Sequence, residues 1–210
     1  SGALMHHLVA DYRLQYDIFR KVTIDAAILD DPATAPEQID RVLGRCVSEH
    51  LPVYLELPVD MARRPCELPS QAYSAPVPQS DPDALRECVE EVATSLGKAS
   101  HPIVLVGGEV SRLRLGNKAL ALIEQLELPF ATMLSAKSVL PEFHPQFVGL
   151  YQGNWSRPVV KEQVETSDCL ISLGAWMTDL DTGMFSAKLD PRNLVAAKGG
   201  HVQIRSHYYH

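Results

Sequence analysis

The sequence of 210 residues lacks a long apolar run, since no stretch approaches the ~18 consecutive apolar residues expected of a membrane-spanning helix. It also lacks a basic excess: 19 Lys and Arg residues stand against 26 Asp and Glu residues, which gives a net charge of −7 and argues against a nucleic-acid partner. The opening residues 1–5 have neither the basic start nor the apolar stretch of a signal peptide. We therefore expect a cytoplasmic protein with no membrane and no nucleic-acid partner.

Closely spaced cysteines are absent as well. The sequence has Cys46, Cys66, Cys88 and Cys169, which form no Cys-x-x-Cys pair, so a zinc site is not indicated. We interpret them as reduced thiols, some of which fill core volume. No pattern of basic neighbours indicates a lowered thiol pKa at Cys66 or Cys88, so neither is favoured as an activator-binding thiol.

The common nucleotide-binding motifs G-x-G-x-x-G and G-x-x-x-x-G-K-[ST] are also missing. Small or polar residues nevertheless follow three expected strands, at residues 107–109, 135–138 and 174–176. Such strand ends are where doubly wound sheets bind ligands. We expect Gly107 and Gly108 to make a strand-to-helix turn, and a nucleotide site there remains the less favoured alternative.

What the sequence does contain is typical of a soluble globular protein: 46% hydrophobic and 21% charged residues. The length corresponds to one large domain or to one and a half. Residues 63–82 include five prolines, which neither a helix nor a central strand tolerates. This segment therefore predicts an extended linker between two blocks.

In the first block, the sequence predicts two helices followed by a strand. Residues 17–29 are expected to be helical. A second helix is expected to start at residues 34–37, with Thr34 or Ala35 as the cap, Pro36 in the first turn and Glu37 completing a capping box. The apolar face of this helix comprises Ile39, Val42, Leu43, Cys46 and Val47, and the helix is expected to end at residues 50–52 before a buried strand at residues 53–57.

The second block alternates amphipathic helices with short apolar strands. Helices are expected at residues 82–99, 115–127 and 157–167, and strands at residues 103–106, 130–134, 169–173, 194–197 and 202–204. Continuously apolar strands between helices are typical of a parallel sheet covered on both faces. The predicted fold class is therefore α/β, with a doubly wound parallel sheet.

The neighbouring His6 and His7 are the most chemically suggestive pair, because imidazoles transfer protons near neutral pH. From the pair alone, one surface and one packed histidine is the more common situation, and a two-histidine metal chelate is awkward because adjacent side chains diverge. Residues 6–11 also match the His-His-x-x-x-Asp motif of acyltransferases and condensation domains, in which Asp11 would orient His7. Tyr12 stands where that motif usually has glycine.

A longer resemblance runs through nearly the whole chain. Its distinctive segments follow one another in order, at residues 4–7, 34–41, 52–58, 103–107, 131–133, 136–138, 149–153, 156–174 and 179–183. Together they resemble the thiamine-diphosphate-dependent 2-oxo acid decarboxylases of the pyruvate and indolepyruvate decarboxylase group. The resemblance implies the end of a pyrimidine-binding domain at residues 1–62, a linker at 63–81 and the central domain at 82–210.

The resemblance also implies an activity. Family members release carbon dioxide from a 2-oxo acid and form an aldehyde, with thiamine diphosphate and magnesium as cofactors. His6 and His7 match a dipeptide that lies over the cofactor and handles protons, which decarboxylation requires. The full-length enzyme is expected to be a homodimer or homotetramer that acts on a small-molecule 2-oxo acid.

By the same resemblance, the activating glutamate lies before residue 1, and the Gly-Asp-Gly…Asn motif for diphosphate and magnesium lies beyond residue 210. We therefore expect the chain alone to bind no cofactor and to be inactive. A non-catalytic module that binds a nucleotide or regulator is the alternative, because some relatives keep a flavin or ADP in the central domain.

The acidic segment that contains Asp179 and Asp181, followed by Thr182 and Gly183, suggests a metal or ribose site by composition. In the resemblance it belongs to a loop that faces other domains. We expect its side chains to shape a turn by hydrogen bonding. Trp155 and Trp176 are candidates for an interface, with the core as the alternative.

Overall fold

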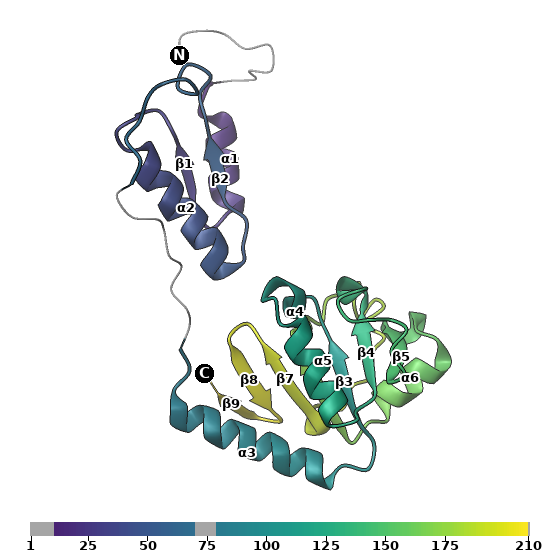
Figure 1. Cartoon of the computed structure of the whole chain (residues 1–210). Coiled ribbons are helices and arrows are strands. Elements are labelled where there is room, and N and C mark those ends of the chain that lie inside the picture. Colours follow the sequence, from purple (N-terminus) through teal and green to yellow (C-terminus); the bar gives the residue numbers. More distant parts are fainter. Residues whose placement is uncertain (1–10, 70–78, 210) are drawn as a thin grey trace. The chain divides into compact units, whose positions relative to one another are not determined.

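The computed structural model describes residues 11–69 and 79–209 (Figure 1). The chain divides into two compact units, residues 1–78 and residues 79–210, and each has a sheet and an apolar core of its own. The division falls inside the proline-rich segment, whose described residues 63–69 and 79–81 form no helix or strand. His6, His7 and residues 70–78 lie outside the described residues.

The first unit contains α1 (Leu14–Val22), β1 (Ala26–Ile28), α2 (Ala35–Glu49) and β2 (Tyr54–Glu56). The two strands pair in parallel, with Ala26 opposite Tyr54. Ala27, Leu29 and Val42 are buried together between this sheet and α2. A strand, a helix and a parallel strand make one βαβ unit, as expected for a piece of an α/β domain.

The helix predicted for residues 17–29 is wrong beyond Val22. Thr23 has extended backbone angles (φ −124°, ψ 157°), and the N–H of Ile24 donates to the carbonyl of Pro52 at 3.1 Å. The following residues form β1. A short apolar run fits either a helix or a buried strand, and here pairing with β2 and burial against α2 decide in favour of the strand.

The second helix starts and ends where the sequence predicts, but the capping box is wrong. Thr34 has helical backbone angles and its side chain makes no capping hydrogen bond. Instead its Oγ1 accepts from Gln38 Nε2 at 3.1 Å, and Asp31 Oδ1 accepts from the N–H of Ala33 at 3.0 Å. His50 ends the helix in the left-handed conformation, with φ 54°.

The second unit carries the larger sheet. Its helices are α3 (Pro82–Lys98), α4 (Glu109–Arg112), α5 (Gly116–Gln125) and α6 (Pro158–Glu165), with 3₁₀ turns η1 (Leu134–Ala136), η2 (Gly153–Trp155) and η3 (Pro191–Asn193). Its strands are β3 (Pro102–Val106), β4 (Phe130–Met133), β5 (Phe147–Tyr151), β6 (Cys169–Leu173), β7 (Leu194–Lys198), β8 (His201–Ile204) and β9 (His207–Tyr209). All the helices and strands predicted for the second block are present, within two residues at their ends.

The strand order is β5-β4-β3-β6-β7-β8-β9. Each pair from β5 to β7 is parallel, which confirms the doubly wound α/β prediction for the core of the sheet. β8 and β9 are antiparallel additions at one edge. β7 and β8 are joined by Gly199 and Gly200, both with positive φ, and a two-residue loop of this kind forms a tight hairpin that reverses the chain.

Two layers of helices cover the sheet. On one face, Ala119 and Ile123 of α5 pack with Val104 and Val106 of β3. On the other face, Val160 and Val164 of α6 pack with the alternate β3 residues. α3 lies over β8 and β9 and buries Cys88 against Ile204 and Tyr209. The alternating burial of β3 towards both layers is what a fully apolar strand predicts.

Three elements of this unit are absent from the sequence-based prediction. β5 contains a central glycine, and its first four residues are only half buried, so the hydrophobic pattern typical of a strand is weak there. β9 follows a sharp turn at Arg205 and exposes two of its three residues. α4 has four residues, which is too short for helical periodicity to register.

Candidate functional site at the carboxyl edge of the sheet

The strand order places the switch point of the large sheet between β3 and β6. From β3 the chain moves outward through β4 and β5, then returns to β6 and continues through β7 on the other side. Ligands of doubly wound sheets bind beyond the carboxyl ends of the strands at such a point. The candidate site therefore lies where β3 ends at Val106 and β6 ends at Leu173.

Gly107 lets the two strand ends approach each other. Its N–H donates to the carbonyl of Leu173 at 2.8 Å. A Cβ placed on Gly107 would lie 2.2 Å from both the carbonyl oxygen of Gly174 and the Cα of Ala175. The glycine is thus required by the chain's own backbone, and the structure agrees with the expectation that the two glycines make a strand-to-helix turn.

Glu109, the first residue of α4, joins three strand ends. Its Oε1 accepts from Trp176 Nε1 at 2.8 Å, and its Oε2 accepts from the N–H of Gly199 at 3.0 Å. The Lys198 ammonium lies 5.3 Å from the centre of the Trp176 ring, within range of a cation–π contact. The sequence marks residues 107–109 and 174–176 as strand ends at this edge, but it does not indicate that Glu109 pairs with Trp176 and Gly199, because only the parallel topology brings these residues together.

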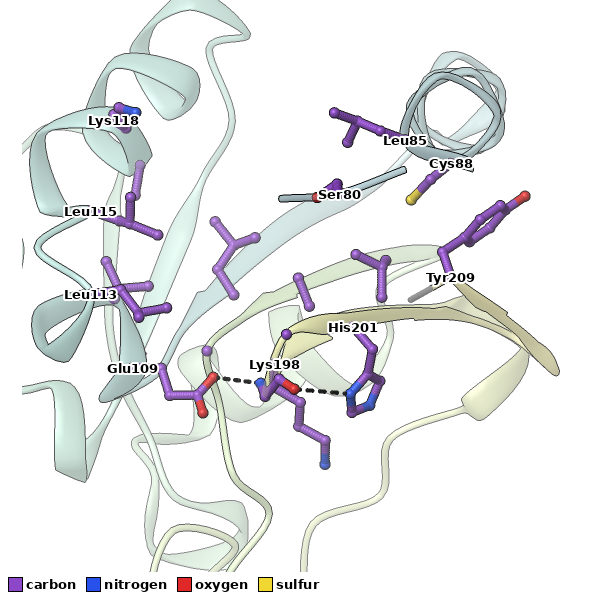
Figure 2. Close-up of a pocket in the computed structure, with 18 of the residues that line it drawn as sticks. Ser80, Leu85, Cys88, Glu109, Leu113, Leu115, Lys118, Lys198, His201 and Tyr209 are labelled. Atoms are coloured by element: carbon purple, nitrogen blue, oxygen red, sulfur yellow. Dashed lines mark hydrogen bonds between the residues drawn. The ribbon is translucent and has the colours of Figure 1, made fainter. Parts of the chain in front are cut away.

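Beside Glu109 lies a cavity of about 470 Å³ (Figure 2). Its walls come from α3, from the segment between α4 and α5, from α5, and from the ends of β6 to β9. Figure 2 shows Leu113, Leu115 and Lys118 on one side and Leu85 and Cys88 on the other. A mainly apolar cavity of this size falls in the range of small-molecule sites.

Cys88 and Tyr209 close the α3 side of the cavity. Burial, and then the nearby charge of Glu91, raise the pKa of the Cys88 thiol. Burial and the hydrogen bond to Glu91 likewise raise the pKa of Tyr209, whose hydroxyl donates to Glu91 Oε2 at 2.7 Å. Cys88 therefore stays a neutral thiol, which agrees with the expectation that no basic neighbours lower its pKa.

The acidic segment near the end of β6 shapes its own turn. Asp181 is buried, and its Oδ1 accepts from the N–H of Ser135 at 3.2 Å while Oδ2 accepts from Thr178 Oγ1 at 3.2 Å. Asp179 accepts from the neighbouring N–H of Leu180. Both carboxylates are engaged by the chain itself, which confirms the predicted turn-shaping role.

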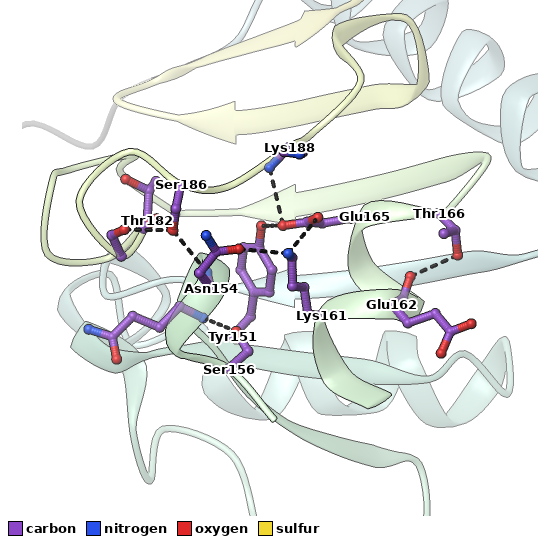
Figure 3. Close-up of polar contacts among 12 residues, drawn as sticks. Tyr151, Asn154, Ser156, Lys161, Glu162, Glu165, Thr166, Thr182, Ser186 and Lys188 are labelled. Atoms are coloured by element: carbon purple, nitrogen blue, oxygen red, sulfur yellow. Dashed lines mark hydrogen bonds and ion pairs between the residues drawn. The ribbon is translucent and has the colours of Figure 1, made fainter. Parts of the chain in front are cut away.

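A second polar network fixes the loop that follows (Figure 3). The hydroxyl of the fully buried Tyr151 donates to Glu165 Oε1 at 3.0 Å, and the N–H of Lys188 donates to the same oxygen at 3.2 Å. Lys161 donates to Asn154 at 2.6 Å and lies 3.8 Å from Glu165 Oε2. Burial, and then the Glu165 charge, raise the pKa of Tyr151, so it remains a donor and the network holds β5, α6 and residues 178–188 together.

The remaining candidates have mixed outcomes. His6 and His7 lie outside the described residues, so their role stays a prediction. Asp11 accepts from the N–H of Arg13 at 2.7 Å, next to the start of α1. Trp155 and Trp176 are about half exposed, so the core alternative is wrong for both and an interface role stays a prediction.

All four cysteines are free, and Cys88 and Cys169 are buried, which confirms the expectation of core thiols. Among residues 11–69 and 79–209, no group of three or more His, Cys, Asp and Glu side chains is placed to hold a metal ion. Within the same residues, no helix has the length and apolar character needed to cross a membrane.

Comparison with known proteins gives one family. The family model described as "Thiamine pyrophosphate enzyme, central domain" matches residues 89–209. The chain is 32% identical over 207 residues to a pyruvate decarboxylase of Candida albicans, covering 96% of this chain and 36% of that protein. It is 33% identical over 209 residues to an indole-3-pyruvate decarboxylase of Azospirillum brasilense, covering 100% of this chain and 38% of that protein.

A third relative, pyruvate decarboxylase isozyme 1 of Saccharomyces cerevisiae, is 29% identical over 97% of this chain and 37% of its own length. The chain thus spans less than two fifths of the length of these curated relatives. The similarity includes the first unit and the linker as well as the large sheet.

Proposed function

The chain belongs to the thiamine pyrophosphate enzyme family, and we propose that it forms part of a decarboxylase that converts 2-oxo acids to an aldehyde and carbon dioxide with thiamine diphosphate and magnesium. One observation carries this proposal: relatives named as pyruvate and indole-3-pyruvate decarboxylases match 96–100% of the chain. The family model alone would support only the central domain.

We assign residues 1–62 to the end of the pyrimidine-binding domain, residues 63–81 to the linker and residues 82–210 to the central domain. The division of the chain after Pro78 supports this assignment. The doubly wound sheet supports the assignment of residues 82–210 to the central domain, because its parallel strands hold the polar residues at the carboxyl edge in fixed positions. The oligomer of the whole enzyme, a homodimer or homotetramer, is part of the same proposal.

The described residues contribute a frame and not the reacting groups. None of their acidic clusters fits a diphosphate-bound magnesium ion, because Asp181 and Glu165 already accept hydrogen bonds from the chain itself. The Gly-Asp-Gly motif is likewise absent from the sequence. We therefore assign no step of the reaction to residues 11–69 or 79–209.

His6 and His7 are the residues of this chain that we propose to act near the cofactor. When bound, thiamine diphosphate supplies the electron sink for decarboxylation, and the protein must deliver protons. A pair of imidazoles suits that task because their pKa lies near neutral pH. We further propose a cytoplasmic location, which the four free cysteines support because unpaired thiols persist in reducing compartments.

The test is carbon dioxide release from pyruvate, indolepyruvate and phenylpyruvate in the presence of thiamine diphosphate and magnesium. The whole enzyme that carries this chain is expected to turn over at least one of the three acids, and the 210-residue chain alone none. Turnover by the chain alone would overturn the assignment of the reacting groups to other segments. Replacement of His6 or His7 by Gln is expected to lower kcat and leave cofactor binding intact.

The alternative of a nucleotide- or regulator-binding module has one observation in its favour, the cavity between α3 and α5. What this cavity can bind depends on the groups at the switch point. The described residues do not support the acyltransferase alternative, because Asp11 accepts a hydrogen bond from the backbone N–H of Arg13.

A further inference from the structure

Phe143 is the most exposed large apolar side chain among the described residues. It lies in the segment between β4 and β5, and its exposed fraction is 102%, so no other described part of the chain covers it. Exposed aromatic side chains are enriched at protein interfaces, where they often contribute most of the binding energy. The surroundings of Phe143 therefore show what kind of partner it suits.

The residues on both sides of Phe143 are held in place. Glu142 accepts two hydrogen bonds from Lys137 Nζ, at 3.0 and 2.9 Å. On the other side, His144 Nε2 lies 3.3 Å from Glu124 Oε1 on α5. Because the backbone around Phe143 is fixed by these contacts, a partner that binds its ring has little loop entropy to remove.

A groove of about 490 Å³ lies beside Phe143. The start of α5 forms one wall and residues 138–143 form the other, with apolar surface from Leu120, Val139 and Pro141. The walls approach closely at Gly116, where an added Cβ would lie 3.5 Å from the carbonyl oxygen of Val139. An apolar cavity of roughly 150 Å³ already holds a benzene ring, so this groove has room for one aromatic side chain.

Two features favour a second copy of this chain as the partner. Phe143 itself lines the groove, so the aromatic ring and the groove are neighbours on one surface. A two-fold axis can then place each ring in the groove of the other copy, so that one contact is made twice. The chain has a net charge of −7, but Glu142 is the one charged residue among those that line the groove, and Lys137 pairs with it. The two copies therefore bring no unpaired like charges together in this lining.

We propose that two copies of this chain pair through this surface, each with its Phe143 in the groove of the other copy between α5 and residues 138–143. The proposal does not rest on the decarboxylase activity, because its readout is the oligomeric state of this chain and not the release of carbon dioxide.

Sedimentation equilibrium of the full chain measures the pairing. The wild-type chain is expected to form a dimer with a Kd between about 1 and 100 µM. Phe143→Ser is expected to raise this Kd at least about tenfold, because both copies lose their aromatic anchor. Phe185→Ser is the matched control and is expected to leave the Kd unchanged, because Phe185 is also largely exposed (71%) and does not line the groove. A wild-type chain that stays monomeric at about 100 µM, or equal effects of the two changes, would overturn the proposal.

A second pair of variants tests the groove. Asn117→Asp adds a carboxylate to the groove wall with almost no change of shape, and it is expected to raise the Kd about tenfold, because the charge loses water when the copies pair. Gln125→Glu makes the same exchange at an exposed position of α5 outside the groove and is expected to leave the Kd unchanged. An unchanged Kd in Asn117→Asp, or an equal rise in both variants, would contradict the placement of Phe143 in the groove.

Discussion

At the scale of single residues, the switch point is packed so closely that residue 107 has no room for a side chain larger than a hydrogen atom. The α-carbon of Gly107 faces the backbone of Gly174 and Ala175. Two glycines after a strand predict a turn, but the sequence does not say whether the missing side chain makes room for a ligand or for the chain itself. The geometry shows that the missing side chain makes room for the chain's own backbone at Gly174 and Ala175.

Gly107→Ala is therefore expected to destabilise the second unit by about 1–3 kcal/mol, because the new Cβ overlaps main-chain atoms of Gly174 and Ala175, which would have to shift. Urea denaturation followed by circular dichroism measures the change. The matched control is Gly97→Ala in α3, where nothing lies within 4 Å of the added Cβ. This second change is expected to stabilise by up to about 1 kcal/mol, because alanine favours the helix. A neutral Gly107→Ala would contradict the packing described.

Glu109 illustrates what the sequence does not reveal at this scale. Its position after a strand marks it as polar and near the carboxyl edge, but its partners Trp176 and Gly199 are more than sixty residues away. Such a cluster depends on which strands are neighbours, and strand order is not encoded in local patterns. The chemistry of this edge therefore follows from the topology of the sheet.

At the scale of elements, the start of α3 is defined by a complete cap. Asp81 Oδ1 accepts from the N–H groups of Asp83 and Ala84 at 3.0 and 2.8 Å, and Pro82 follows at the first helical position. Both features are visible in the sequence, which is why this helix is predictable to its first residue.

Asp81→Ala is expected to lower the free energy of unfolding by about 1 kcal/mol, within a range of about 0.5–2 kcal/mol, since two amide groups lose their acceptor. Asp81→Asn keeps an acceptor oxygen, so it is expected to lower the free energy of unfolding by only a small part of this amount. Denaturant unfolding of the two variants provides the comparison. Equal losses in both would show that the charge of Asp81, and not its capping hydrogen bonds, stabilises the helix.

Asp168 links two elements and gives the fold a pH dependence. Its oxygens accept from the N–H groups of Ser100 and His101 at 2.7 and 2.8 Å, which joins the loop before β3 to the start of β6. These two hydrogen bonds, the Ser100 bond first, lower the pKa of Asp168 in the folded chain. Because the folded pKa lies below the unfolded one, the stabilisation is complete above about pH 4 and is lost as the pH falls through the lowered folded pKa.

Asp168→Asn is expected to reduce stability at pH 7 and to flatten the fall in stability on acidification. Thermal unfolding at a series of pH values between about 7 and 2 measures both effects. Glu90→Gln, an exposed position on α3, serves as the control and is expected to leave the profile unchanged. If Asp168→Asn kept the wild-type pH profile, the assigned role of the carboxylate would be wrong.

The elements that escape sequence-based prediction share a physical cause. β1 is formed by an apolar run that also suits a helix, and its pairing with β2 settles the matter. β5 contains Gly149 and buries only Tyr151 fully, so neither alternation nor a continuous apolar run marks it. Long amphipathic helices and fully buried strands, such as α3 and β3, are visible in the sequence because their patterns do not depend on a distant partner.

At the scale of the whole molecule, the chain combines a small βαβ unit with a seven-stranded central sheet. The order of the resembling segments along the sequence indicates the family, and the family model and the relatives confirm it. The acidic residues Asp179 and Asp181, which follow β6, accept hydrogen bonds from the chain itself and have a structural role. The proposed catalytic pair at residues 6–7 rests on the resemblance and on imidazole chemistry.

The most direct measurement of the central claim is carbon dioxide release by the whole enzyme that carries this chain, compared with and without thiamine diphosphate. A 2-oxo acid decarboxylase should release carbon dioxide and the matching aldehyde in equal amounts from pyruvate, indolepyruvate or phenylpyruvate, and only with the cofactor. Release of neither product from any of the three acids by the cofactor-loaded enzyme would contradict the assignment.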